Sequence, residues 1–158
     1  MVRPATSDDM ESVYMMGFDV WGEAGNQIGY LEQCHTSPKY KRGQWYVLCD
    51  TQGKTISSLI SYNLSVGVFG IGSIATLPTL RRQGLAKHLI QVVLSILNRE
   101  GAKTIYLFSD IKPDYYEKLG FVRLPTDFQN HKDSICMVRG TPVQELTRQP
   151  GFAPPSYF

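Results

Sequence analysis

Apolar and polar positions along the chain predict both strands and helices. Short runs rich in β-branched and aromatic residues, bounded by turn residues, predict strands over residues 2–5, 44–49, 55–63, 66–77, 104–108, 121–124 and 134–139. A tight turn is expected at 50–53, where Asp-Thr-Gln-Gly separates two of these runs. Gly67, Gly70 and Gly72 favour a bulge or a close backbone approach in the fourth strand.

The clearest helix is predicted over residues 84–97. Apolar side chains recur there with helical spacing and form one stripe: Leu85, Leu89, Ile90, Val92, Val93, Ile96 and Leu97. Thr6 or Ser7 is expected to cap an earlier helix, and shorter helices are predicted over 30–34 and 113–119. Residues 39–42 are interpreted as a solvated loop. The order of elements predicts a mixed α/β domain around one sheet.

Length and composition favour a single globular domain. A chain of 158 residues with 42% apolar residues can bury an adequate core. We expect the domain to occupy residues 1–140 and an extended tail, 141–158, to pack on it or on a partner. Neither a membrane span nor a signal peptide is apparent in the sequence. The three cysteines are odd in number and contain no CxxC pair, which favours reduced thiols, a cytoplasmic location and no metal.

Charge is distributed unevenly along the chain. The net charge of +2 is too small to indicate a nucleic-acid partner. Between Asp50 and Glu100, however, there is no acidic residue, whereas that segment contains Lys54, Arg81, Arg82, Lys87 and Arg99. A locally positive segment fits an anionic small molecule, and the alternative is a chance gap over a buried sheet and helix.

A basic, glycine-containing segment joins the fourth strand to the best helix. The N-terminus of a helix presents N–H groups and partial positive charge, so it binds phosphates. Gly84 and Ala86 leave the backbone accessible, and Arg81, Arg82 and Lys87 add charge around it. A pyrophosphate site is therefore indicated; an ordinary connection with solvated arginines is the alternative. Neither GxxxxGK[ST] nor a GxGxxG dinucleotide fingerprint is present.

Two sequence blocks resemble the GCN5-related N-acetyltransferase (GNAT) superfamily. Residues 81–86, Arg-Arg-Gln-Gly-Leu-Ala, match its [Q/R]-x-x-G-x-[G/A] signature, and residues 115–121, Tyr-Tyr-Glu-Lys-Leu-Gly-Phe, are similar to its F-Y-E-K-L-G-F segment. Their order and spacing also fit the family. The resemblance implies a mostly antiparallel twisted sheet that splays between strands four and five and is flanked by helices.

The resemblance also implies a cofactor and its contacts. Acetyl-CoA would be the co-substrate, with its pantetheine arm paired to the main chain of Ile74, Ala75 and Thr76. Its pyrophosphate would be held by the loop residues, namely Arg81, Arg82, Gln83, Gly84, Leu85, Ala86 and Lys87. Ser109 stands where the family often has an asparagine that touches the cofactor. Tyr116 matches the family's tyrosine that protonates the leaving thiolate, and the alternative is a packing aromatic residue.

The expected reaction is direct attack of a primary amine of a small molecule or peptide on the thioester. It needs a route for the amine proton, donors for the oxyanion and an acid for the thiolate. Some family members use a glutamate on the fourth strand as the base. This chain has no counterpart of that glutamate, because residues 51–99 lack carboxylates. The proton would leave through water or to a residue near the N-terminus, or no base would be needed for an acceptor of low pKa. The candidates near the N-terminus are Asp19, Glu23, Glu32 and His35, and the alternative for each is an ordinary surface residue.

Two other interpretations remain open. One is a domain of the same fold that binds acyl-CoA as a sensor without turnover. The other is a partner-binding α/β domain without a cofactor. No nucleic-acid or membrane partner is expected, and a homodimer is left open.

Overall fold

The fold is built on one mixed sheet. The structure, a computed structural model, describes residues 1–22 and 26–158. Hydrogen bonds join the strands of these residues in the order β1-β2-β3-β4-β5-β7-β6. The strands are β1 (Val2–Pro4), β2 (Gln44–Cys49), β3 (Thr55–Ser65), β4 (Val68–Thr76), β5 (Thr104–Ser109), β6 (Val122–Arg123) and β7 (Ile135–Arg139). The mixed α/β class and the flanking helices are as predicted.

Pairing in the sheet is mostly antiparallel. The pairs β1–β2, β2–β3, β5–β7 and β6–β7 are antiparallel, whereas β4 and β5 run parallel. The parallel register joins Val68–Gly70 to Thr104–Tyr106, at the beginning of both strands. This limited register is consistent with the splay expected between the fourth and fifth strands.

The helices are mostly short. They are α1 (Met10–Met16), α2 (Phe18–Trp21), α3 (Gln27–Thr36), α4 (Pro38–Arg42), α5 (Leu85–Arg99), α6 (Asp114–Glu117) and α7 (Val143–Thr147), with 3-10 turns η1 (Ser7–Asp9), η2 (Pro78–Leu80) and η3 (Thr126–Phe128). Within the described residues, none of these helices is long and apolar enough to cross a membrane. The three cysteines are free, buried thiols.

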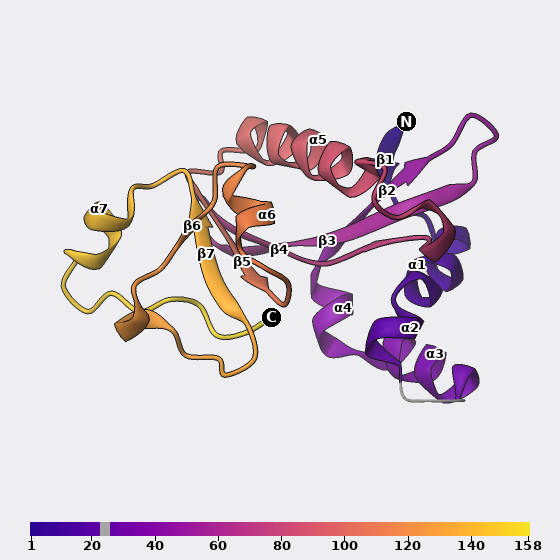
Figure 1. Cartoon of the computed structure of the whole chain (residues 1–158), viewed down its shortest axis with the longest axis horizontal. Helices are drawn as coiled ribbons and strands as arrows, with labels where there is room; N and C mark the ends of the chain where they lie inside the picture. The colour runs from indigo at the N-terminus through magenta and orange to yellow at the C-terminus, as the bar shows by residue number, and fades with distance from the viewer. Residues whose placement is uncertain (23–25) are drawn as a thin grey trace. The chain divides into compact units, whose positions relative to one another are not determined.

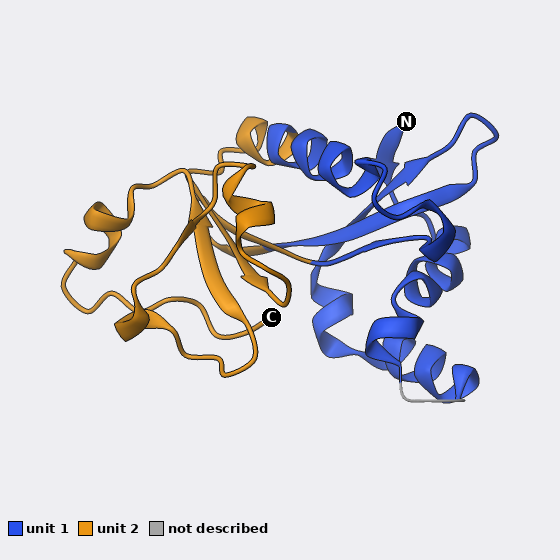
Figure 2. Ribbon diagram, viewed as in Figure 1, with its two compact units in different colours: residues 1–62, 73–95 blue, residues 63–72, 96–158 orange. Residues whose placement is uncertain are grey.

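The chain forms two compact units (Figure 2). Unit 1 contains residues 1–62 and 73–95, and unit 2 contains residues 63–72 and 96–158. The elements β3, β4 and α5 contribute residues to both units.

In unit 1, helices lie on both faces of the β1–β3 strands. Helix α5 lies on one side of these strands and α1–α4 lie on the other (Figure 1). Buried apolar side chains of these strands and helices form the core of unit 1; among them are Val13, Met16, Val47, Leu59, Ile60, Leu89, Ile90 and Val93. The buried stripe of α5 also includes Leu94, which the predicted stripe omitted, whereas Leu85, Val92 and Ile96 are only half-buried.

Unit 2 has its own core, which the C-terminal segment helps to build. Buried side chains of β5, β7, α7 and the β6–β7 region form it, and Phe152 and Phe158 pack against it. The Phe158 ring lies so close to Gly70 of β4 that a Cβ at this position would overlap the ring. The segment expected to be wholly extended contains α7, although residues 152–158 have no regular structure. The boundary between domain and tail remains a prediction.

Two local features differ from the sequence predictions. Residues 38–42 form α4 where a solvated loop was expected, because the Ser37 side chain accepts a hydrogen bond from the Tyr40 N–H and Pro38 occupies the first turn. In β4 the left-handed residue is Ser73, with φ of 46°, whereas the glycines had indicated the place for a bulge. Left-handed backbone at a serine costs about 1 kcal/mol, so the surrounding structure holds it in place.

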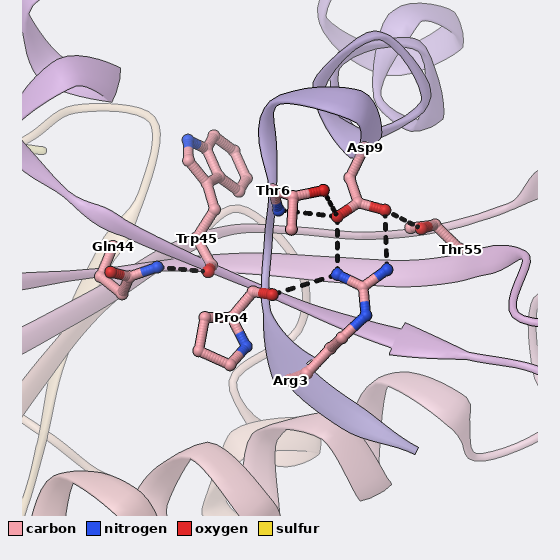
Figure 3. A network of polar contacts seen from close by, with 7 residues as sticks. All are labelled: Arg3, Pro4, Thr6, Asp9, Gln44, Trp45 and Thr55. Carbon is pink, nitrogen blue, oxygen red and sulfur yellow. Dashed lines mark hydrogen bonds and ion pairs between the residues drawn. The ribbon is translucent and has the colours of Figure 1, made fainter.

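A buried carboxylate joins the first strand to the first helical turn of unit 1. The two carboxylate oxygens of Asp9 lie 2.7 and 3.0 Å from the Arg3 guanidinium (Figure 3). Asp9 also accepts hydrogen bonds from the Thr6 N–H at 2.7 Å and from the Thr55 hydroxyl at 3.0 Å. These donors hold the pKa of the Asp9 carboxyl well below its usual range, with Arg3 as the main cause.

We expect Asp9→Asn to destabilise the protein by about 1–3 kcal/mol at pH 7, because donors to the carboxylate lose an acceptor. The lowered pKa means that Asp9 stabilises the fold fully above pH of about 4 and progressively less as pH falls. The difference in melting temperature between the wild type and Asp9→Asn should therefore stay constant from pH 7 to about pH 5 and begin to narrow as pH falls toward 3, without closing in that range. The exposed neighbouring substitution Asp8→Asn is the control, and an equal loss there would contradict the assignment.

Candidate active site

The loop between β4 and α5 has an unusual backbone. After the η2 turn, Arg82 and Gly84 both adopt left-handed conformations, with φ of 63° and 79°. A Cβ placed on Gly84 would meet no other atom within 4 Å, so the space beside this residue is open. Left-handed residues in such loops turn successive N–H groups toward one side, where they can bind an anion.

The N-terminus of α5 continues this positive region. The first helical hydrogen bond runs from the His88 N–H to the Gly84 carbonyl at 3.0 Å. The N–H groups of Leu85, Ala86 and Lys87 therefore belong to the first turn, which does not take part in the i to i−4 ladder. No acidic residue lies in this turn. Arg82, Gln83 and Lys87 are exposed.

Arg81, the first residue of the loop motif, has its side chain bound elsewhere in unit 1. Its guanidinium pairs with both carboxylate oxygens of Asp19, at 2.7 and 2.8 Å. It also donates to the carbonyl oxygens of Thr76 at 3.0 Å and Met16 at 3.2 Å. The pair with Asp19 was not predicted from the sequence, because 62 positions separate the two residues and no local pattern joins them.

The end of β4 presents two different edges. The Leu77 N–H bonds to the Ile56 carbonyl of β3 at 3.0 Å, and the Ser57 hydroxyl of β3 donates to the Ala75 carbonyl at 2.8 Å. Main-chain groups of successive residues alternate between the two edges of a strand. Ala75 therefore faces β3, while the main-chain groups of Ile74 and Thr76 face the opposite edge, which is the edge that a strand-like ligand arm would use.

In unit 2, Tyr116 lies in the short helix α6. Pro113 precedes this helix, and its carbonyl accepts a hydrogen bond from the Tyr116 N–H at 2.9 Å. The residue is only 8% exposed, and its ring makes edge contacts with Tyr115 and Phe121, at centroid distances of 5.1 and 6.3 Å. Burial raises the pKa of the Tyr116 phenol well above its usual value, so the hydroxyl keeps its proton at neutral pH.

Ser109, at the end of β5, is also buried. Its hydroxyl donates to the Ile111 carbonyl at 2.7 Å, in the turn that follows the strand. The side chain therefore stabilises this turn. A role for Ser109 toward a cofactor stays a prediction.

The early region contributes weak candidates for a base. Asp19 is paired with Arg81, and this pairing lowers the pKa of its carboxyl. Glu32 and His35 are exposed on α3, where the His35 ring lies edge-on to Tyr14 at 5.0 Å. Glu23 lies outside the described residues. Among residues 1–22 and 26–158, no group of three or more His, Cys, Asp or Glu side chains could hold a metal ion.

A family model matches most of the chain. The model described as "Acetyltransferase (GNAT) domain" covers residues 1–123, which include β1 to β6 and the motif loop. The chain belongs to the GNAT acetyltransferase family. A search of curated proteins finds no match to the sequence.

Solved structures share this fold at low sequence identity. A PaiA N-acetyltransferase from Thermoplasma acidophilum in complex with coenzyme A is 9% identical, with a TM-score of 0.70 over 89% of this chain and 98% of that chain. A GNAT N-acetyltransferase from Escherichia coli in complex with CoA is 17% identical, with a TM-score of 0.68 over 88% and 79%. A spermidine N-acetyltransferase chimera from Vibrio cholerae and hSSAT is 17% identical, with a TM-score of 0.67 over 88% and 94%.

Membership in the GNAT family supports acyl transfer that depends on an acyl-CoA. The acceptor is a separate question, because the low identities of the solved relatives bear on the fold alone.

Proposed function

We propose that this protein transfers the acetyl group of acetyl-CoA to a primary amine of a small molecule or peptide. The observation that carries the proposal is the β4–α5 loop of a GNAT chain, with left-handed Arg82 and Gly84, open space beside Gly84 and the N-terminus of α5. This arrangement suits a pyrophosphate. Calorimetry with CoA and acetyl-CoA tests binding, and release of the free thiol with a panel of amines tests transfer.

The proposed cofactor contacts come from two segments, the β4–α5 loop and the end of strand β4. The N–H groups of residues 82–87 would bind the pyrophosphate, with Arg82 and Lys87 adding positive charge. Main-chain groups of Ile74 and the Thr76 N–H would pair with the pantetheine arm, because they face away from β3, whereas the Thr76 carbonyl already accepts a hydrogen bond from Arg81 Nε. Ala75, whose carbonyl accepts the Ser57 hydroxyl, would contribute packing.

Tyr116 is proposed as the acid that protonates the leaving thiolate. Its raised pKa keeps the phenol protonated, which an acid needs before the reaction. A free thiol has a lower pKa than this phenol, so transfer of the proton from Tyr116 to the thiolate is uphill in free energy. The step therefore needs a hydroxyl held beside the sulfur and a phenolate that regains its proton from solvent. The proposal for Tyr116 thus depends on positioning.

The acceptor amine must reach the reaction in its neutral form. Residues 51–99 contain no carboxylate, and Asp19, the early acid with a defined partner, is held ionised by Arg81. A carboxyl with a lowered pKa is a weak base. We therefore propose that the acceptor is already partly neutral near pH 7 or loses its proton to water.

We expect the pH midpoint of acetyl transfer to follow the acceptor. The rate should rise with pH until the pKa of the amine is reached, since only the neutral amine attacks. Three amines of different basicity should therefore give three midpoints in pH–rate profiles of kcat/KM. A constant midpoint that disappears on substitution of Glu32 or His35 would instead identify an enzymic base.

A sensor that binds acyl-CoA without turnover is the second candidate. The lack of carboxylates between residues 51 and 99 favours it, because such a module needs no base. Tight CoA binding together with no thiol release over the whole amine panel would support the sensor.

The cytoplasmic location also remains a prediction, based on the unpaired cysteines.

A further inference from the structure

The side chain of Arg81 connects three segments of unit 1. It lies in the β4–α5 loop, and it bonds to the last residue of β4 through the Thr76 carbonyl and to the end of α1 through the Met16 carbonyl. Its two terminal nitrogens also bind the two carboxylate oxygens of Asp19 in α2. The guanidinium thus makes four hydrogen bonds to the protein.

This arrangement uses the full geometry of arginine. The Arg81 Nε and both terminal nitrogens donate hydrogen bonds, which a lysine ammonium could not reproduce from one point. Two parallel bonds to one carboxylate are directional as well as strong. The Arg81 side chain is 34% exposed and that of Asp19 is 45% exposed, so the pair is also open to water and salt.

Arg81 immediately precedes the left-handed residue of the loop. Its own backbone is extended, with φ of −66° and ψ of 158°, and Arg82 then turns to φ of 63°. A loop held at Arg81 enters this turn from a fixed position and direction. Without that anchor, a ligand of the loop would have to order it on binding and would bind more weakly.

We propose that Arg81 is a positioning residue, which holds the phosphate-binding loop in shape through Asp19 of α2 and does not itself bind phosphate. The inference rests on the proposed function, because it assumes that the loop binds CoA. It also links α2 to the cofactor. Ligand binding that favours the ordered loop must stabilise the Asp19 contact, by reciprocity of linked equilibria.

The substitution Asp19→Asn separates this role from direct phosphate binding. If Arg81 contacted phosphate, removal of its carboxylate partner would free the guanidinium and tighten CoA binding. If Arg81 is an anchor, CoA should bind about three- to tenfold more weakly, the size expected for one partly exposed bidentate pair. The two roles therefore predict changes of opposite sign.

Further variants in the same calorimetric series sharpen the result. Asp19→Glu keeps a carboxylate and should retain more affinity than Asp19→Asn. Arg81→Lys keeps the positive charge but cannot form the two parallel hydrogen bonds to the carboxylate, so this variant should bind CoA as weakly as Asp19→Asn. The matched control is Glu11→Gln, which removes an exposed acid of α1 and should leave affinity unchanged. Thermal melts verify that each variant is folded.

Hydrogen exchange provides a second measurement. If the Arg81–Asp19 pair only stabilised the fold, CoA would not change the rate of amide exchange in α2. The Trp21 and Gly22 N–H groups donate to carbonyls at the start of α2. CoA should slow their exchange in the wild type and much less in Asp19→Asn. Unchanged or tighter CoA binding by Asp19→Asn, with the wild type binding normally, would overturn the anchor alone. A wild-type protein that binds no CoA would overturn the proposed function and the anchor together.

Discussion

Gly84→Glu is expected to abolish CoA binding while the chain still folds. The residue has φ of 79° and open space beside it, so a side chain would project where the proposal puts the pyrophosphate. A carboxylate there would repel the anion and occupy its position. We expect the affinity for CoA to fall by at least about 100-fold, which corresponds to roughly 3 kcal/mol. Calorimetry measures this loss.

Gly53 supplies a matched control for the backbone cost of this substitution. It lies in the β2–β3 turn with φ of 81° and, like Gly84, has no atom within 4 Å of the place that a Cβ would occupy. Gly53→Glu should therefore lower the melting temperature about as much as Gly84→Glu, since both place a side chain on left-handed backbone. Only Gly84→Glu should lose affinity for CoA.

Gly84→Gln and Gly84→Lys then separate the effect of side-chain bulk from that of charge, and Gly84→Lys should retain the most affinity for CoA. Full CoA binding by a folded Gly84→Glu protein would remove the loop from the proposed site.

Tyr116→Phe is expected to lower turnover by about 10²- to 10⁴-fold, the range for loss of a general acid. The substitution keeps the ring, which packs against Tyr115 and Phe121, and removes only the hydroxyl. CoA affinity should change little, because the proposed binding groups belong to the β4–α5 region. Steady-state kinetics with the best acceptor amine, together with CoA titration, measure both effects.

The neighbouring Tyr115 provides the control for Tyr116. Tyr115 has the same side chain and lies in the same helix, but it is 36% exposed. Tyr115→Phe should leave turnover nearly unchanged. Replacement of the leaving thiol by one of lower pKa should partly restore the rate of Tyr116→Phe, since such a thiolate needs less protonation. Near-native turnover by Tyr116→Phe would make this tyrosine a packing residue.

The motif loop illustrates how far the sequence alone could go. Residues 81–86 identified the family, and Gly84 with Ala86 indicated an accessible backbone before α5; the family is confirmed by the matching family profile over residues 1–123. The sequence did not predict what the Arg81 side chain does. Its partner Asp19 lies 62 positions away, and an arginine beside a glycine is equally compatible with a phosphate ligand, a solvated side chain or an anchor.

Local sequence chemistry determined most elements and their order. Alternating and clustered apolar residues placed the strands, helical spacing placed α5, and the Asp50–Gly53 turn joined β2 to β3. The capping signals Ser37 and Pro38 of α4 were also local and could have been read from the sequence. Such features depend on neighbours within a few positions, which is why pattern and propensity are sufficient to predict them.

Tertiary structure alone decided the contacts between distant segments. The pairing of Arg81 with Asp19, the left-handed backbone at Ser73 and the packing of Phe158 on Gly70 depend on which segments meet after folding. The same holds for the edges of β4, where bonds to Ile56 and Ser57 leave Ile74 and Thr76 facing the other way. Periodicity shows that a strand forms but does not show which edge its neighbour takes, because hydrogen bonds between strands depend on the register of residues far apart in the chain.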